Sequence, residues 1–488
     1  MASSLPNGLR IAFIHPDLGL GGAERLVVDA ATELVRSGHH VDMYTAYYDP
    51  QRCFEETKTG GFAVHTAGTW FPRHVLGRML ALCAYVRCVL VAIHIAWRCF
   101  LAGTKGSYDI IIADQVSVVV PVVKMLMPRT KVLFYCHFPD LLLTKRESAL
   151  KKLYRAPLDY LEEITTGAAD LILVNSNYTR GVFAQTFRRL AARAVLPSVL
   201  YPAVPIPEVS SLRSADADWR GELDPELVAF IDGGGGATFL SINRFERKKG
   251  IGLALEALHE LRLAAGEDHA TCSAAAVAAS GGGGGGGGSG GVARDGPPRL
   301  VVAGGYDPRL PENVEHLKEL REAARQLGML DDVRFVPSFT DRQRTLLLAA
   351  CRAVLYTPQH EHFGIVPLEA MAAERPVVAC ASGGPTESVT HGSAGFLCEP
   401  TPAAFAAAMR ELLDRDAAEA MGRAARAHVE ARFSRRAFGS QLDGYVRGLM
   451  LAALPAGGAV GGGAGAGAGA GGAATGAAVK GKGQAKRS

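Results

Sequence analysis

The chain has 488 residues, 57 of them glycine, and a formal net charge of +4. Both excesses are local, because glycines crowd residues 281–291 and 457–483, and four cations without an acid occupy the last nine residues. The neutral remainder and the 48% hydrophobic content exclude a disordered chain, a collagen and a protein whose main surface binds nucleic acid.

Nine cysteines are scattered along the chain, an odd number with no C-x-x-C pair and no Cys/His spacing typical of a metal site. This pattern favours a reducing compartment over a disulfide framework. The N-terminus is polar, and we expect no signal peptide there.

Short β-branched runs alternate with helical stretches in two series. Buried parallel strands of doubly wound α/β domains have this pattern. We predict an α/β protein with one Rossmann-like domain at residues 8–205, a linker at 206–236 and a second such domain at 237–412. The predicted strands are Ile11–His15, Val41–Thr45, Ile110–Ala113, Val132–His137, Leu171–Asn175, Thr238–Asn243, Leu300–Gly304, Val333–Val336, Ala353–Tyr356, Val377–Cys380 and Phe396–Cys398.

Three further segments have distinct compositions. Residues 266–298 form an Ala/Gly/Ser insert that cannot bury enough surface to order itself. Residues 402–451 have helical spacing and predict two or three helices that end the second domain. The helices of residues 413–451 form its C-terminal segment. Residues 454–488 predict a disordered Gly/Ala tail with a basic tip.

Residues 74–102 contain no acidic residue and many large apolar side chains. Their longest stretch without a formal charge, residues 88–97, is shorter than the roughly 20 apolar residues of a membrane-spanning helix. At about 100° per residue, Arg87, His94 and Arg98 share one side of a helix. A basic stripe on an apolar helix is typical of a helix in the membrane surface, and a buried domain helix is the alternative.

A glycine-rich loop, residues 19–24, follows the first strand and opens a helix. Gly21 and Gly22 permit a tight turn that aims backbone N–H groups at an anion, so we predict a phosphate loop. The dinucleotide fingerprint G-x-G-x-x-G requires glycine where Glu24 stands. A nicotinamide-dependent dehydrogenase is therefore disfavoured.

Polar clusters follow successive strands of the second series, and the carboxyl ends of such strands meet in one crevice. Arg244 and Lys249 could flank a diphosphate, although a solvated basic turn is the alternative. The turn at Gly383 and Gly384 could present backbone N–H groups to a ligand, or could simply connect a strand to a helix.

Glu361 and Glu369 form the third cluster of this crevice. Eight helical residues would separate them by about 12 Å. The paired carboxylates of a glycosidase lie closer together, at about 5–9.5 Å. Glu361 and Glu369 are therefore better suited to the two ends of an elongated ligand, such as a nucleotide sugar.

The spacings Glu361-x7-Glu369 and Arg244-x4-Lys249, with the Gly21–Gly22 loop, resemble the retaining family 4 glycosyltransferases of GT-B fold over residues 9–450. Three runs are similar to the mannosyltransferases of dolichol-linked oligosaccharide synthesis, namely YCHFPD at 135–140, AGGYD at 303–307 and YTPQHEHFGIVPLEAM at 356–371. The poly-glycine insert and the Gly/Ala tail depart from this pattern.

The resemblance implies two Rossmann-like domains facing a central cleft, with GDP-mannose as the donor. The implied acceptor is a dolichyl-diphosphate-linked chitobiose with one mannose, which receives α-1,3 and α-1,6 mannose during N-glycan precursor assembly. The implied place is the cytosolic face of the endoplasmic reticulum membrane. Partners would be this membrane surface and other mannosyltransferases of the same pathway, and no nucleic acid.

The resemblance also implies roles for single residues. Arg244 and Lys249 would hold the donor diphosphate, Glu369 the ribose, and Glu361 would lie beside the mannose. His137 would contact the mannose hydroxyls from the first domain. The implied catalytic and donor-binding residues are Glu361, His137, Arg244, Lys249, Phe363, Gly364, Glu369, Gly383 and Gly384, with Gly21 and Gly22 on the acceptor side.

Fixed cations and N–H donors can stabilise the charge that develops on a leaving diphosphate. We therefore expect no required cofactor and no metal site, with Mg2+ at most stimulating transfer. No protein nucleophile is evident near the sugar, which favours front-face substitution. A soluble UDP-sugar glycosyltransferase and an inactive membrane scaffold are the alternatives, and the apolar segment 74–102 argues against a soluble acceptor.

Overall fold

The computed structural model describes residues 8–75, 79–103, 107–143, 149–208, 222–233, 235–264 and 296–452. Most of the predicted insert 266–298, much of the predicted linker 206–236 and the whole tail 454–488 lie outside these residues. The predictions made for those segments stay predictions.

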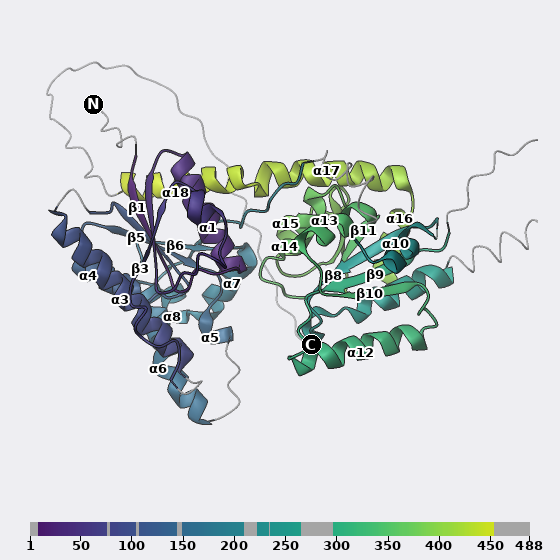
Figure 1. The fold of residues 1–488 in the computed structure, drawn as a ribbon, viewed down its shortest axis with the longest axis horizontal. Coiled ribbons are helices and arrows are strands. Elements are labelled where there is room, and N and C mark those ends of the chain that lie inside the picture. Colours follow the sequence, from purple (N-terminus) through teal and green to yellow (C-terminus); the bar gives the residue numbers. More distant parts are fainter. Residues whose placement is uncertain are drawn as a thin grey trace, which may run out of the picture.

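The first half of the molecule is built on a seven-stranded parallel sheet with strand order β3-β2-β1-β4-β5-β6-β7 (Figure 1). Its five predicted strands are present and mostly buried, because they are nearly continuous apolar runs. The two edge strands were not indicated, since β3 is half-exposed and β7 has two residues. The strands are β1 (Arg10–His15), β2 (His40–Thr45), β3 (Ala63–Thr66), β4 (Ile110–Asp114), β5 (Lys131–Cys136), β6 (Leu171–Val174) and β7 (Ser198–Val199).

Helices cover both faces of this sheet. Alternate residues of β1 show the two sides, since Ile11 and Phe13 share a core with α1, whereas Ala12 and Ile14 share one with α3 and α4. The helices of this half are α1 (Gly22–Arg36), α2 (Glu56–Thr59), α3 (Leu80–Leu101), α4 (Val119–Leu126), α5 (Asp140–Leu143), α6 (Ala149–Thr166), α7 (Asn177–Thr186) and α8 (Arg188–Ala192).

The second half has a six-stranded parallel sheet with strand order β10-β9-β8-β11-β12-β13. All six predicted strands are present. They are β8 (Thr238–Ile242), β9 (Arg299–Gly304), β10 (Val333–Pro337), β11 (Ala353–Tyr356), β12 (Val377–Cys380) and β13 (Gly395–Cys398). The helices are α10 (Pro225–Asp232), a helix whose described part is 252–264, α12 (Pro311–Gln326), α13 (Asp341–Ala350), α14 (Ile365–Ala372), α15 (Pro385–Ser388), α16 (Pro402–Glu411), α17 (Arg415–Phe433) and α18 (Arg435–Leu451).

Both sheets reverse their strand order beside the first strand of each half, between β1 and β4 and between β8 and β11. In doubly wound sheets, ligands bind at the carboxyl ends of the strands at such points. The predicted fold of two doubly wound α/β units is thereby confirmed.

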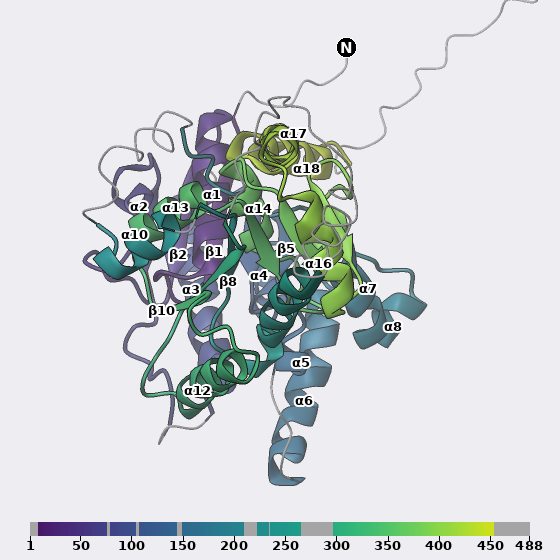
Figure 2. The ribbon, with the colours of Figure 1, turned by 90° about the vertical axis from the view of Figure 1, so that its right-hand side faces the viewer.

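The sequence led us to expect that the helices of residues 402–451 end the second half. In the structure, α18 packs on the first half instead. Figures 1 and 2 show α17 and α18 along one edge of the molecule, with α18 over the first half. Phe438, Leu442 and Val446 of α18 are buried in the core that α1 shares with β1. The helical spacing revealed an apolar stripe but not the sheet against which it packs.

The apolar segment 74–102 contains α3, the helix among the described residues whose length and composition would allow it to cross a membrane. One side of α3 packs on the first sheet through Cys88, Val91 and Ile95. The predicted basic stripe is wrong for Arg87, which is buried, ion-pairs with Asp17 at 2.9 Å and donates to the Ala46 carbonyl oxygen at 2.8 Å. α3 is thus a domain helix with one uncovered side.

Candidate active site

An ion pair joins two residues predicted for the donor site. Lys249 ends the 3₁₀ turn Arg247–Lys249 after β8, and its Nζ contacts Oε1 of Glu361, in the loop between β11 and α14. Their side chains are only 12% and 25% exposed. Thr357 donates a 2.8 Å hydrogen bond to the Lys249 carbonyl oxygen and ties the turn to β11. A largely buried cation therefore lies at the strand ends where the topology places a ligand.

Gly383 and Gly384 pack against the backbone of the loop that carries Glu361. A Cβ atom on Gly384 would lie 2.1 Å from the Phe363 carbonyl oxygen, and one on Gly383 would lie 2.4 Å from that of Glu361. Gly383 has φ +65°, which favours glycine. We expected the Gly384 N–H group to face a ligand. It donates instead to the Glu361 carbonyl oxygen at 2.8 Å. These glycines position the acidic loop.

Phe363 and Gly364, in the same loop as Glu361, both pack against other parts of the protein. Phe363 is buried, and its ring lies 5.9 Å from Tyr201 and 6.1 Å from Phe433, between the two halves. This burial argues against the predicted direct contact of its side chain with the donor. Gly364 has φ +78° and precedes α14, where a Cβ atom would lie 3.2 Å from the Tyr356 hydroxyl.

Glu369 lies on α14 and is separated from the Glu361 ion pair. Because α14 begins at Ile365, the helical rise of 12 Å does not describe the spacing of the two carboxylates. Glu369 Oε1 accepts a 2.7 Å hydrogen bond from Arg344, while its Oε2 is buried without a hydrogen-bond partner. Burial raises the pKa of Glu369, against the opposing effect of Arg344. The free oxygen is suited to accept a bond from a ligand hydroxyl.

Arg244 stands apart from the Lys249–Glu361 pair. Its side chain is 62% exposed and pairs with Glu246 at 2.8 Å. Its stem lies beside Gly305, just after β9, where a Cβ atom would be 3.3 Å from the Arg244 Cγ. The structure therefore keeps Arg244 at the strand ends but does not bring it into contact with the other predicted donor-site residues.

His137 belongs to a buried cluster that the sequence did not reveal as a unit. Asp114 Oδ2 contacts His137 Nε2 at 2.9 Å, and its Oδ1 contacts His15 Nδ1 at 2.8 Å. Burial opposes ionisation of Asp114, yet the two histidines hold its pKa at about 2. The pKa of His15 is raised, since Asp114 outweighs the effect of burial. Across the described residues, no group of His, Cys, Asp and Glu is arranged to hold a metal ion.

One signal could have revealed this cluster. His15 ends β1, Asp114 ends β4, and His137 follows the last residue of β5. β4 pairs with both of the other strands, so three polar side chains meet at neighbouring strand ends.

The Gly21–Gly22 loop opens α1 near this cluster. Gly21 is the residue before the helix, and a Cβ atom on it would lie 2.2 Å from a Glu24 carboxylate oxygen, whereas one on Gly22 would meet open space. The Glu24 carboxylate thus lies over the loop and competes with an anion there. Its charge also contributes to the raised pKa of His15.

Residues beside His137 contact the loop of Glu361 across the two halves. The ring of Phe138 stacks on His362 at 3.6 Å between centroids, and Ser176 Oγ donates to the His362 carbonyl oxygen. Glu387 accepts hydrogen bonds from the backbone N–H groups of Asn177 and Tyr178, both at 2.7 Å. The acidic loop and the segment that carries His137 therefore lie next to each other, one from each half of the molecule.

Two Rossmann-like halves whose polar loops meet have the architecture of the GT-B fold. Solved structures agree with this class, since the chain aligns with the sucrose-phosphate synthase of Thermosynechococcus elongatus at a TM-score of 0.62 and 21% identity, covering 91% of this chain and all of that one. Anabaena HepE in complex with UDP and glucose aligns at 0.58 and 19% identity, covering 90% and all of the two chains.

The sequence comparisons are more specific. Residues 20–197 match Glycosyltransferase Family 4, and residues 291–428 match Glycosyl transferases group 1. The chain is 45% identical over 445 residues to the alpha-1,3/1,6-mannosyltransferases ALG2 of Mus musculus and Homo sapiens, covering 90% of this chain and 96% of each relative. The ALG2 of Rhizomucor pusillus is 41% identical, with coverage of 89% and 90%. The chain belongs to the alpha-1,3/1,6-mannosyltransferase family.

Proposed function

We propose that this enzyme transfers mannose from GDP-mannose to dolichyl-diphosphate-linked Man-GlcNAc2, first in α-1,3 and then in α-1,6 linkage. The observation that carries the proposal is the Lys249–Glu361 ion pair, together with the contact between Phe138 and His362, the chain neighbours of His137 and Glu361. It supplies a positive charge for a leaving diphosphate and a carboxylate for sugar hydroxyls.

Each donor-site residue has a distinct part in this proposal. Lys249 is fixed at the strand ends and stabilises the charge that develops on the departing GDP. Arg244, exposed on a flexible stem, swings from Glu246 to the diphosphate. Glu369 accepts a hydrogen bond from the ribose through its unpartnered Oε2.

The sugar is held between Glu361 and His137. Asp114 fixes the His137 ring through Nε2, so that the ring is oriented before mannose binds. Glu361 is paired with Lys249, which makes its carboxylate a poor nucleophile. We therefore propose front-face substitution, in which the departing phosphate takes the acceptor proton.

Transfer requires no resident metal in this proposal, because Lys249 and Arg244 supply the positive charge, and Mg2+ at most stimulates it.

The proposed place of action is the cytosolic face of the endoplasmic reticulum membrane. The uncovered side of α3 carries exposed apolar side chains, among them Ile93, Trp97 and Phe100. Such a helix lies in the headgroup region with its apolar side toward the acyl chains. Other mannosyltransferases that act on the same lipid are the proposed protein partners.

One assay tests the reaction. Purified enzyme receives GDP-mannose and a phytanyl-diphosphate-linked Man-GlcNAc2, and the products are separated by mass. We expect the gain of two mannoses, with linkages assigned by α-mannosidases of known specificity. Turnover with UDP-glucose instead would favour a different sugar-nucleotide enzyme, and no turnover with any donor would favour an inactive scaffold. Excess EDTA should leave transfer largely intact if no metal is required.

A further inference from the structure

α6 has the opposite polarity to an ordinary surface helix. Among the described side chains of α6, those that are exposed apart from Lys152 follow the spacing of one helical side, and they are apolar or aromatic: Leu153, Ala156, Pro157, Tyr160, Leu161 and Ile164. In a surface helix of a soluble domain, the apolar stripe faces the core and the charged residues face water. The exposed stripe of α6 therefore lacks the environment that its side chains favour.

Three charged residues of α6, Arg155, Glu162 and Glu163, point into the protein and have polar partners there. Arg155 contacts Asp140 at 2.7 Å and Asp159 at 3.2 Å, and its side chain is only 3% exposed. Glu162 accepts hydrogen bonds from the backbone N–H groups of Asp140 at 2.7 Å and of Leu141 at 3.1 Å, where α5 begins.

A second inward carboxylate has an equally defined position. Glu163 accepts the Arg189 backbone N–H at 2.6 Å and contacts its guanidinium at 2.8 Å, at the start of α8. Burying charges is costly unless each is paired, and these pairs meet that condition. The inward charges thus fix the orientation of α6, and rotating the helix to hide its apolar side would break every one of these contacts.

The exposed stripe continues onto the neighbouring helices. α4 lies between α3 and α6 and contacts both, and all three cover the same face of the first sheet (Figure 1). α3 contributes Ile93, Trp97, Phe100 and Leu101 to this outer surface, and α4 contributes Met125 and Leu126. Exposed apolar side chains gathered on three helices of one sheet face are typical of an interaction site.

The exposed charges of these helices are cationic. Among the described side chains of α3, α4 and α6, the carboxylates are those of Asp159, Glu162 and Glu163, and all three face inward. Arg98 and Lys152 are exposed, whereas Lys124 of α4 is partly buried and pairs with Asp170 at 3.0 Å. Apolar side chains flanked by exposed cations complement the acyl chains and anionic headgroups of a bilayer.

We propose that α6 is a second membrane-inserting element, and that its exposed stripe together with the uncovered side of α3 seats the enzyme on an anionic bilayer. This inference builds on the proposed function, in which the acceptor is a lipid. α5 and α6 follow directly from His137 and Phe138, which face the cleft. Seating α6 in the headgroup region therefore places the histidine side of the cleft next to the surface from which a lipid-linked diphosphate emerges.

Vesicle flotation of the full chain tests α6. The test variant is Leu161→Glu with Ile164→Glu, and the control is Leu310→Glu, an even more exposed leucine in the second half. Vesicles contain phosphatidylcholine with 30% phosphatidylserine, or phosphatidylcholine alone. We expect the control to float like the wild type and the double variant to lose at least about tenfold in partitioning, since two inserted apolar side chains are replaced. Wild-type partitioning should also fall on neutral vesicles.

Further measurements separate the possible failures. Equal flotation of the double variant and the wild type would overturn the proposal. So would a concentration-dependent dimer, seen by sedimentation velocity, that the double variant abolishes while vesicle binding of the wild type is absent. Circular dichroism and thermal melting check that the variant folds. Transfer to a short-chain, water-soluble acceptor should be unchanged in the double variant, and its absence in the wild type would count against the proposed reaction and not against membrane seating.

Discussion

Asp114 is the residue on which the first-half side of the cleft depends. One oxygen orients His137, which faces the cleft, and the other holds His15, which is fully buried. A sequence reading finds His137 through its motif but passes over Asp114, because a single acid after an apolar strand has no distinguishing pattern. Only the pairing of β4 with β1 and β5 brings the three side chains together.

Asp114→Asn should lower kcat by about 10²-fold, because a misplaced His137 no longer orients the mannose. KM for the lipid acceptor should change little. His15→Gln, which removes the other partner of Asp114, should have a smaller effect on kcat. Steady-state kinetics with varied lipid acceptor at saturating GDP-mannose would separate kcat from this KM, and a loss confined to KM would contradict the positioning role.

The same substitution should change the pH dependence of stability. The folded pKa of His15 lies above its ordinary value of 6.5, so the stabilisation by its charged form is complete below pH 6.5 and is lost as pH rises through the raised pKa. Asp114 stays ionised over this range, since its pKa is about 2. The difference in melting temperature between wild type and Asp114→Asn should therefore be largest near pH ~6 and shrink above neutrality. A constant difference would argue against a charged His15.

Lys249 and Lys248 offer a matched pair of neighbouring cations. Lys249 is largely buried against Glu361, whereas Lys248 is 66% exposed and pairs with Glu246 at 3.1 Å. Lys249→Ala should lower transfer by about 10²–10³-fold, the usual effect of removing one fixed group that stabilises a developing anion. Lys248→Ala should stay within a few fold of wild type. Equal losses in initial-rate assays would mean that the turn contributes only diffuse positive charge.

At the scale of elements, Gly384 shows how a strand-to-helix turn sets the geometry of a loop. A methyl group at Gly384 would collide with the backbone of Phe363, so Gly384→Ala should displace the acidic loop and cost about 1–3 kcal/mol of stability. Gly444→Ala in α18, where a Cβ atom meets nothing, should be neutral or slightly stabilising. Chemical denaturation measures both. An unfolding free energy for Gly384→Ala equal to that of wild type would show that the loop yields without cost.

The sequence predicted elements better than their surroundings. Eleven strands were found because each is a short apolar run, and most of them are buried in their sheets. β3 escaped notice, since its Ala-Val-His-Thr sequence is largely uncovered at the sheet edge. In α3 the spacing correctly placed Arg87 on one side of a helix, but spacing does not tell which side meets the protein, and Asp17 draws Arg87 inward.

The site was predictable to a similar degree. Lys249 and Glu361 were found because each follows a strand of the same sheet, and such strand ends converge. Arg344, the partner of Glu369, was not found from the sequence. It lies within α13 and carries no strand-end signal.

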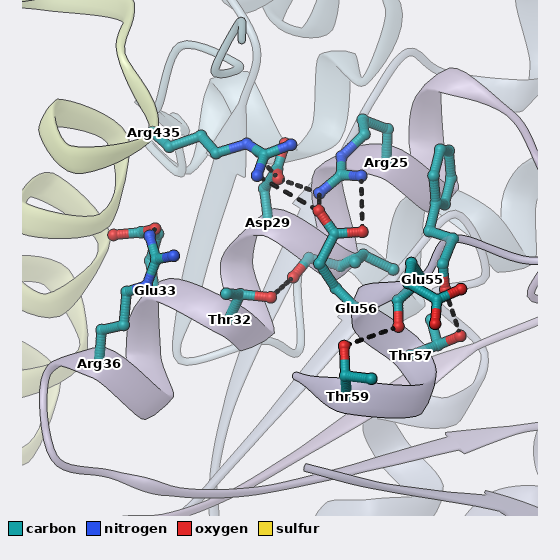
Figure 3. Close-up of polar contacts among 12 residues, drawn as sticks. Arg25, Asp29, Thr32, Glu33, Arg36, Glu55, Glu56, Thr57, Thr59 and Arg435 are labelled. Carbon is teal, nitrogen blue, oxygen red and sulfur yellow. Dashed lines mark hydrogen bonds and ion pairs between the residues drawn. The ribbon is translucent and has the colours of Figure 1, made fainter. Parts of the chain in front are cut away.

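At the scale of the whole molecule, α18 joins the second half to the first. Its first residue, Arg435, ion-pairs with Asp29 of α1 at 3.0 Å and with Glu56 of α2 at 3.2 Å (Figure 3). Arg25 hydrogen-bonds the same Glu56 at 2.8 Å. Arg25 is the main reason that the pKa of Glu56 is only about 2, and the Arg435 charge adds to it. This cluster and the buried stripe of α18 hold α18 on the first half of the molecule.

Arg435→Ala should therefore destabilise the protein by about 1–3 kcal/mol, because Asp29 is almost fully buried and loses one of its two cationic partners. Arg325→Ala is the control, since Arg325 forms an exposed pair with Glu322 on α12 and such pairs contribute about 0–1 kcal/mol. The folded pKa of Glu56 is depressed, so its stabilisation is present above its ordinary pKa of 4.5 and is lost as pH falls toward 2. Thermal melts should thus show the effect of Arg435→Ala in full near neutrality and a smaller effect below about pH 4. Similar losses in both variants, or a loss for Arg435→Ala that does not change with pH, would show that apolar packing alone holds α18 in place.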